Sequence, residues 1–207
     1  MTHSLHRQGT PENLRDDYVV FAMSAKGINE AGSAPKLQEF LRIALRHNPV
    51  YYGDMKTGNM QDVSADKIMA QVRETSIVHA VYTDIDTVAG MLRDVAAADL
   101  GISVVVSGIF DRVKTGCQQA RVQTHTIEHS LGIWGRTDLL PAGDVLEVTT
   151  MCGHGMVAFN LVTSVAADVR AGHMTARAGA LKLAKPCECG IFNPVRAEKL
   201  LEAMARR

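Results

Sequence analysis

The sequence predicts an α/β protein with a predominantly parallel sheet, helices on both faces and a mainly helical C-terminal part. Up to about residue 150, short apolar runs alternate with stretches of helical periodicity. This alternation is typical of β–α–β units, whose strands run parallel. The run 102–106 (ISVVV) is apolar throughout, as expected for a central parallel strand covered on both faces. Ligands of such sheets bind beyond the carboxyl ends of the strands.

Five strands are expected, and the helices between them begin at recognisable caps. Ser33 and Ser64 precede helical patterns, and so does Asp84; each side chain can accept a hydrogen bond from the first helical turn. The loop 51–63 carries two glycines and is either a plain turn or a ligand-contacting loop. Further helices are expected near 110–120, 156–171, 175–184 and 194–206. The strands are expected at 17–24, 77–82, 102–106, 122–127 and 145–150.

These elements divide the chain into three parts. Residues 1–16 are polar and predict an arm, which is either solvated or lends His3, His6 or Arg7 to a site. Residues 17–151 form the sheet domain. Residues 152–207 form a helical part that packs on it and carries the cysteine site.

Composition excludes several classes of function. Apolar residues make up 46% of the chain, so a packed core is expected; Lys plus Arg equals Asp plus Glu at 22 each, so nothing favours nucleic acid or an anionic membrane. No apolar run reaches the roughly 18 residues of a membrane span, and the first 15 residues lack the apolar segment of a signal peptide. We therefore expect a cytoplasmic protein whose four cysteines are ligands, catalysts or core residues rather than disulfides.

The segment 149–156 (TTMCGHGM) is the centre of the predicted site. We expect a strand, a glycine-flanked turn and a helix, with Cys152 beside the first unpaired N–H groups of that helix. Such groups favour negative charge, so the pKa of Cys152 should fall. Asp84 and Ser107 also follow predicted strands, which would place all three residues at one crevice.

Cys152, Cys187 and Cys189 form the strongest candidate set. Thiolates hold iron–sulfur clusters, and three of them leave one iron open. Zinc is the alternative, with His154 as a fourth ligand, and packed core thiols are the plain alternative. Two antiparallel helices between residues 153 and 186 would bring the sulfurs within about 3.5 to 7 Å of one another. Cys117, in the middle of a predicted helix, is expected to be a packed thiol whose replacement leaves metal and activity unchanged.

A metal-free alternative rests on Cys152 and His154, because an imidazole can activate a neighbouring thiolate. The segment 151–154 (MCGH), followed by a helix, resembles a segment of the proline racemase family. The resemblance implies that Cys152 could transfer protons, as the cysteine of that family does. The matching second motif of that family, of CGTG type, does not occur in this sequence.

Residues 125–129 (HTIEH) match the inverted zincin pattern HxxEH. That metalloprotease pattern requires a helix, whereas the β-branched residues around it favour a strand. In either case His125 and His129 share a face, so either could act as a general base. Hydrogen-bonded structural histidines are the alternative.

Three functional hypotheses follow from these patterns. The first is an iron–sulfur enzyme of lyase or hydratase type acting on a small oxygenated substrate, with His154, His125 or His129 moving protons. The second is a metal-free thiol isomerase or transferase, and the third is a non-enzymatic cluster carrier or zinc-stabilised subunit. Neither nucleic acid nor a membrane is expected as a partner, and whether a second copy or a partner subunit completes the site stays open.

Overall fold

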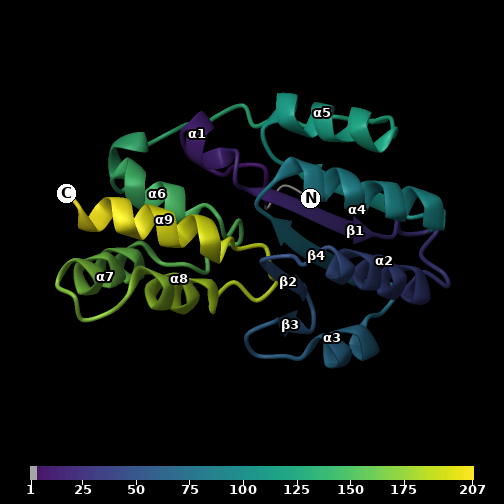
Figure 1. The fold of residues 1–207 in the computed structure, drawn as a ribbon, viewed down its shortest axis with the longest axis horizontal. Coiled ribbons are helices and arrows are strands. Elements are labelled where there is room, and N and C mark those ends of the chain that lie inside the picture. The colour runs from purple at the N-terminus through teal and green to yellow at the C-terminus, as the bar shows by residue number, and fades with distance from the viewer. Residues whose placement is uncertain (1–3) are drawn as a thin grey trace.

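The computed structural model describes residues 4–207 and contains one five-stranded sheet with helices on both faces (Figure 1). The strands lie in the order β3-β2-β4-β1-β5. Every neighbouring pair is antiparallel, which contradicts the predominantly parallel sheet expected from the sequence. The strands are β1 (Tyr18–Met23), β2 (Tyr51–Asp54), β3 (Gly58–Asn59), β4 (Ile77–Tyr82) and β5 (Ser103–Ser107).

The error has a topological cause. β1 and β2 both run antiparallel to β4, so they are parallel to each other with β4 between them. β4 and β5 are likewise parallel, with β1 between them. Each β–α–β crossover is therefore present, but another strand is inserted into it. Two such interleaved units make the split β-α-β-β-α-β arrangement of ferredoxin-like folds.

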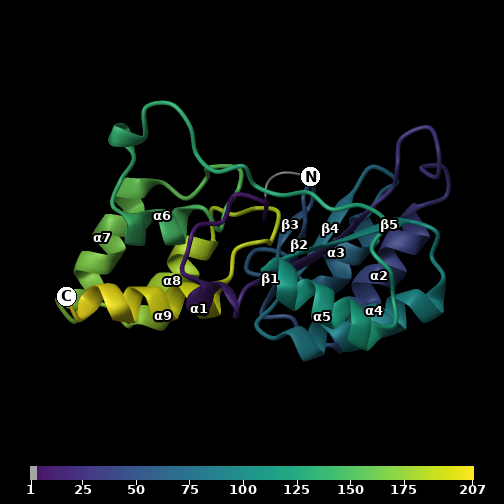
Figure 2. The ribbon, with the colours of Figure 1, turned by 90° about the horizontal axis from the view of Figure 1, so that it is seen from above.

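Side chains alternate along β1 between two separate cores. Tyr18, Val20 and Ala22 pack with α2 (Ala34–Arg46) and α4 (Ile85–Ala98) on one face. Val19 and Phe21 face the C-terminal helices on the other. This period of two is that of a strand buried on both sides. Figure 2 shows the two helical layers on either side of the sheet.

The C-terminal helices form a compact group. The helix α6 (Gly143–Thr149) packs on α7 (Phe159–Arg170) and on α9 (Pro194–Ala205), and α7, α8 (Ala176–Ala184) and α9 all pack on one another. The expected strand at 145–150 is therefore wrong: its buried residues Val145, Val148 and Thr149 follow helical spacing. The remaining helices are α1 (Pro11–Leu14), α3 (Ala65–Gln71), α5 (Phe110–Ala120) and the short 3₁₀ helix η2 (Thr137–Leu139).

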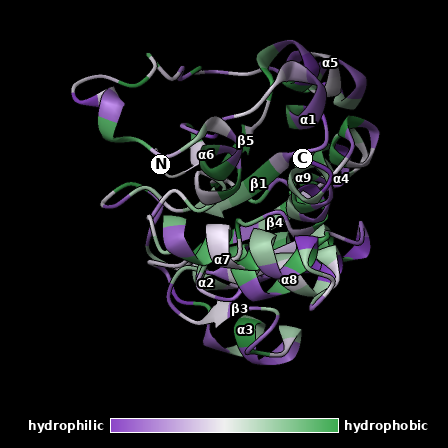
Figure 3. Cartoon of the chain, turned by 90° about the vertical axis from the view of Figure 1, so that its left-hand side faces the viewer, coloured by the Kyte–Doolittle hydropathy of each residue, from purple (hydrophilic) through white to green (hydrophobic). Residues whose placement is uncertain are grey.

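The other wrong strand, 122–127, lies in a long irregular segment. Residues 121–142, here called the strap, run from α5 to α6 and contain only η2 as regular structure. Figure 3 shows the strap bowing away from the body before it returns to α6. Within residues 4–207, no helix is long and apolar enough to cross a membrane.

Candidate thiolate site

The structure brings the three predicted cysteines together from two turns. Cys152 lies in the turn after α6, and Cys187 and Cys189 lie in the turn between α8 and α9. The Sγ atoms of Cys187 and Cys189 are 3.9 Å apart, inside the expected range, and Cys152 and Cys187 are close enough to shift each other's pKa. The helices α7 and α8 pack together and return the chain to Cys152. All three thiols are buried, and Cys187 is fully so.

Backbone N–H groups point at these sulfur atoms. The N–H groups of His154 and Met156 act to lower the pKa of Cys152, and the N–H of Ile191 acts to lower the pKa of Cys187 and of Cys189. Hydrogen bonds from backbone N–H groups stabilise negative charge on sulfur and are typical of the loops that hold metal-bound thiolates. The two turns therefore offer polar support to sulfur inside an otherwise apolar core.

The expected activation of Cys152 is wrong. Its turn follows the C-terminus of α6, and the next helix begins only at Phe159, so Cys152 is not at a helix start. The hydrogen bond with Cys187 and burial raise the pKa of Cys152. Because Cys152 follows a helix and not a strand, it shares no strand-end crevice with Asp84 and Ser107.

The low-pKa thiol of the three is Cys189. The hydrogen bond from Cys187 is the largest cause, and it outweighs burial to lower the pKa of Cys189. At Cys187 the hydrogen bond with Cys152 lowers the pKa, but the bond to Cys189, burial and the charge of Cys189 raise it to about 12. His154 pairs with the same sulfur: its Nδ1 lies 3.6 Å from the Sγ of Cys189.

The loop 51–63 supports the second cysteine turn, a role the sequence does not reveal. It forms the hairpin of β2 and β3. The side-chain amide of Asn59 donates to the carbonyl of Cys187 at 3.2 Å. A Cβ on Gly190, whose φ is +80°, would lie 2.4 Å from the carbonyl carbon of Tyr52, and one on Gly53 would lie 2.9 Å from the carbonyl oxygen of Cys189. Only glycines allow these two backbones to approach so closely.

The N-terminal arm is anchored rather than wholly solvated. Arg7 pairs with the buried carboxylate of Asp17 and donates to the carbonyls of Met151 (3.2 Å) and Ile191. One carbonyl precedes Cys152 and the other follows Cys189 by two residues. Arg196, only 1% exposed at its side chain, binds the other oxygen of Asp17 at 2.9 Å. Arg7, Asp17 and Arg196, here called the arginine clamp, thus tie both cysteine turns to β1. His3 lies outside the described residues.

A cavity of about 760 Å³ adjoins Cys152. Of the three cysteines that form the site, Cys152 alone lines this cavity, whose walls are otherwise largely apolar. His6 from the arm also lines it, and its Nδ1 lies 3.0 Å from the hydroxyl of Ser130 in the strap. The site therefore has a buried side, made by Cys187 and Cys189, and a side open to a small molecule.

The other predicted histidines lie elsewhere. His125 and His129 are exposed on the strap and line a second cavity of about 1050 Å³ beside β5 and α5. The ring of His129 contacts that of Phe110, 5.4 Å away. Because the segment 125–129 is not helical, it lacks the helix that the zincin pattern requires. His6, and neither His125 nor His129, lines the cavity that adjoins Cys152.

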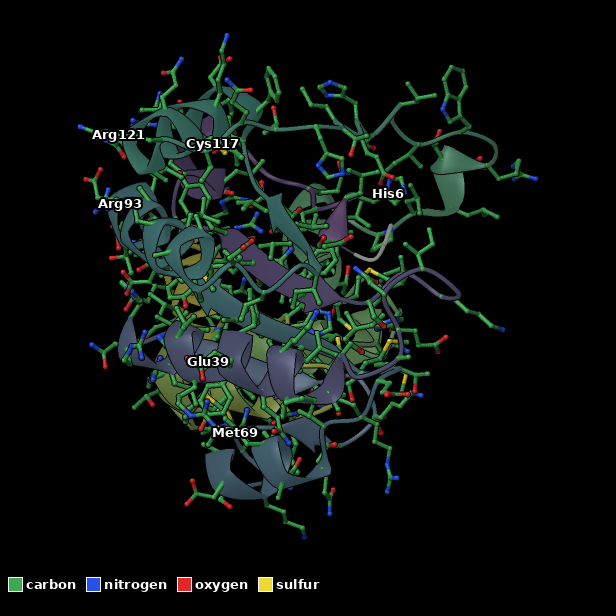
Figure 4. The ribbon with its side chains drawn as sticks, turned by 90° about the vertical axis from the view of Figure 1, so that its right-hand side faces the viewer. His6, Glu39, Met69, Arg93, Cys117 and Arg121 are labelled. Atoms are coloured by element: carbon green, nitrogen blue, oxygen red, sulfur yellow. The ribbon has the colours of Figure 1, made fainter. Side chains whose placement is uncertain are left out.

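Cys117 is the packed thiol that the sequence predicts. It lies in α5, within the core shared with α4, on the opposite face of the sheet from the other three cysteines. Burial raises its pKa. Figure 4 shows Cys117 on α5 and His6 apart from it, beside the strap.

The donor set suits a thiophilic metal, although its geometry is not that of a finished site. In residues 4–207, no group of three or more His, Cys, Asp or Glu side chains is arranged to hold a metal ion as it stands. Two thiolates on one tetrahedral zinc lie about 3.8 Å apart, and a thiolate and an imidazole about 3.6 Å, from bonds of 2.3 and 2.0–2.1 Å. The contacts of Cys189 with Cys187 (3.9 Å) and with His154 (3.6 Å) match these values, but touching thiols have the same spacing.

Comparison with known proteins adds no assignment. No family model, curated protein or solved structure matches the chain.

Proposed function

We propose that this protein is a metal-dependent enzyme whose thiolates Cys152, Cys187 and Cys189 hold an iron–sulfur cluster. The observation that carries the proposal is the convergence of three buried thiols from two turns, with one of them on a cavity wall. A cluster with three protein ligands keeps one iron open to substrate. That iron would supply Lewis-acid chemistry of the kind used by lyases and hydratases on small oxygenated substrates.

Some of the surrounding groups favour charge on sulfur and act against the neighbouring thiols and the burial that raise the pKa of Cys152 and Cys187. Backbone N–H groups reach all three sulfur atoms, and the guanidinium of Arg7 lies against the carbonyls of both turns. Hydrogen bonds and nearby positive charge both stabilise the thiolate form that binds metal. His6, on the cavity wall, is the group placed to exchange a proton with a bound molecule.

Zinc is the second candidate metal, and one observation favours it. The 3.6 Å contact between His154 Nδ1 and Cys189 Sγ has the spacing of two ligands on one ion. Thiolates on different irons of a cluster lie farther apart, so a cluster would require the sulfur atoms of Cys187 and Cys189 to separate. A metal-free thiol enzyme is less well supported, because the pKa of Cys152 is raised and Cys189 does not line the cavity.

The experiment is purification without oxygen, followed by measurement of iron, zinc and acid-labile sulfide per chain and of visible absorption. We expect iron and sulfide in similar amounts and a brown colour. Replacement of Cys152, Cys187 or Cys189 by serine should each remove the bound metal, whereas Cys117→Ser should retain it. A protein without metal, or loss of metal in Cys117→Ser, would refute the proposal.

His154→Gln separates the two metals. A cluster held by three cysteines should survive this replacement, whereas a zinc ion that uses His154 as a ligand should bind at least about tenfold more weakly. The carrier hypothesis predicts that the cluster transfers to an apo-acceptor protein. The enzyme hypothesis predicts that it stays bound while substrate turns over.

A further inference from the structure

The cavity beside Cys152 has a distinctive lining. Its wall is built from α6, from the turn after Cys152, from the start of α7 and from the strap. The side chains of Leu146, Val157 and Phe159 contribute apolar surface, and the strap adds Ile133 and Trp134. The volume of about 760 Å³ falls within the range of small-molecule sites, which are concave and mostly apolar.

The lining carries no charged counterpart for an ionic ligand. Among the described residues that line the cavity, none is Lys, Arg, Asp or Glu. The nearby guanidinium of Arg7 is engaged by Asp17 and by two carbonyls. A carboxylate or phosphate entering the cavity would lose water and meet no cation other than a protonated His6, whose Nδ1 already contacts the hydroxyl of Ser130 at 3.0 Å. An ammonium group would gain no carboxylate.

Polar side chains are a minority of the lining. The hydroxyl of Thr150 donates to the carbonyl of Leu146 at 2.5 Å and accepts from the N–H of Gln8 at 2.9 Å, so the protein itself uses both of these contacts. The hydroxyl of Thr149 donates to the same carbonyl at 3.4 Å. His6, the amide of Asn160 and the indole N–H of Trp134 are the other polar side-chain groups of the wall. They suit one or two hydrogen bonds to an uncharged oxygen or nitrogen.

We infer that this cavity binds an uncharged small molecule with an aromatic or branched aliphatic body and one hydroxyl, carbonyl or amide group. The role of this molecule as a substrate rests on the proposed function, in which the cavity presents it to the cysteine site. Binding itself needs no metal. The strap segment 132–134 is then the part of the wall that contacts the body of the ligand.

The chain provides its own reporter. Trp134 is the only tryptophan of the sequence, lines the cavity and is 82% exposed, so a bound molecule should change its fluorescence. The probes are 4-tert-butylbenzyl alcohol, 4-tert-butylbenzoate and 4-tert-butylbenzylamine, which share a body and differ in charge. We expect saturable binding of the alcohol, and binding of both ions at least about tenfold weaker. Calorimetry on the same protein provides a second measure of each affinity.

One matched pair of variants and one single variant locate the site. Ile133→Ser should weaken binding of the alcohol severalfold, whereas Leu131→Ser, on the same strap but outside the lining, should not. Ala158 is the residue before α7, and its methyl group makes no capping hydrogen bond to the helix. Ala158→Asp is compatible with folding because Asp is a favoured N-cap. It adds a carboxylate to the wall, and it should weaken the alcohol and strengthen the amine about tenfold.

The outcomes decide the inference separately from the metal. Absence of saturable binding by the alcohol, or tighter binding of the benzoate, would overturn it. The emission wavelength of Trp134 without ligand provides a further check. If this emission is already blue-shifted and changes only with protein concentration, a second copy of the chain fills the cavity and the inference is overturned. Binding as expected in a protein without metal would leave the cavity assignment intact and reject the proposed metal function.

Discussion

Replacement of Arg7 by methionine tests the arginine clamp. The side chain of Arg7 is 7% exposed, and it joins the buried Asp17 to the carbonyls of Met151 and Ile191. Methionine fills similar space but donates no hydrogen bond. Asp17 would keep Arg196 at 2.9 Å, so it would not become an unpaired buried charge.

The magnitude follows from the groups left without a donor. Each buried carbonyl that loses its partner costs about 1–3 kcal/mol, so two carbonyls cost about 2–6 kcal/mol, and we take about 3 kcal/mol. For a chain of this length each kcal/mol lowers the Tm by about 2–4 °C. We therefore expect the Tm to fall by about 6–12 °C. The two turns should also loosen, with a lower metal content.

The assay is thermal and urea unfolding of Arg7→Met beside Arg42→Met. Arg42 pairs with Glu39 on the surface of α2, and its side chain is 54% exposed. Exposed pairs of this kind contribute little, so its removal should change stability by less than about 0.5 kcal/mol. Arg7→Lys should be intermediate, because an ammonium group cannot span a carboxylate and two carbonyls. Equal Tm values for Arg7→Met and Arg42→Met would show that the clamp does not hold the fold.

Two further predictions concern the hairpin that supports the cysteine turn. Gly190→Ala should destabilise the protein by more than about 3 kcal/mol in urea unfolding, because the new Cβ would meet the backbone of Tyr52 at 2.4 Å. Gly172 has a similar φ of +73° but no atom within 4 Å of such a Cβ, so Gly172→Ala should cost only about 1 kcal/mol. Similar costs at both sites would contradict the close approach at Gly190. Asn59→Ala should lower stability by about 1 kcal/mol, since it removes one of two donors to the carbonyl of Cys187, which keeps the N–H of Gly190 at 3.1 Å. An unchanged unfolding midpoint would count against this support.

The sequence predicted individual elements better than their arrangement. β4 coincides with the expected strand 77–82, and Asp84 caps α4 as expected, because both depend on short-range pattern. Strand order depends on which strands pair, and local periodicity does not contain that information. The apolar run that suggested a central strand forms β5, whose residues are all half-buried at the sheet edge.

The segment 145–150 shows how a short pattern misleads. Its β-branched residues favoured a strand, yet seven residues suffice for one helical face, and tertiary packing on α7 and α9 decided the outcome. The loop 51–63 was read without strands because its glycines suggested a turn. Those glycines instead allow the hairpin to contact the cysteine turn.

The meeting of the cysteines was predictable because it follows from local geometry. Two helices joined by the short turn at Gly172 return the chain to its starting point. The sequence offered Arg7 only as one of three residues that the arm could lend to a site, and it gave no sign of Asn59. Both residues lie more than 90 residues before the cysteines that they support. A buried arginine and an exposed one look alike in a single sequence.

The arginine clamp also sets an order of assembly. Its two ion pairs close chain segments of very different length, since Arg7 is 10 residues from Asp17 and Arg196 is 179 residues from it. Closing the longer segment costs about 2.6 kcal/mol more free energy, from lost conformational entropy, than closing the shorter one. The local pair therefore forms early in folding, and the distant arginine joins late. Because the last cysteine turn directly precedes the helix that carries Arg196, this late step fixes that turn to β1, and a metal ion bound by all three thiols would slow the rate at which the chain unfolds.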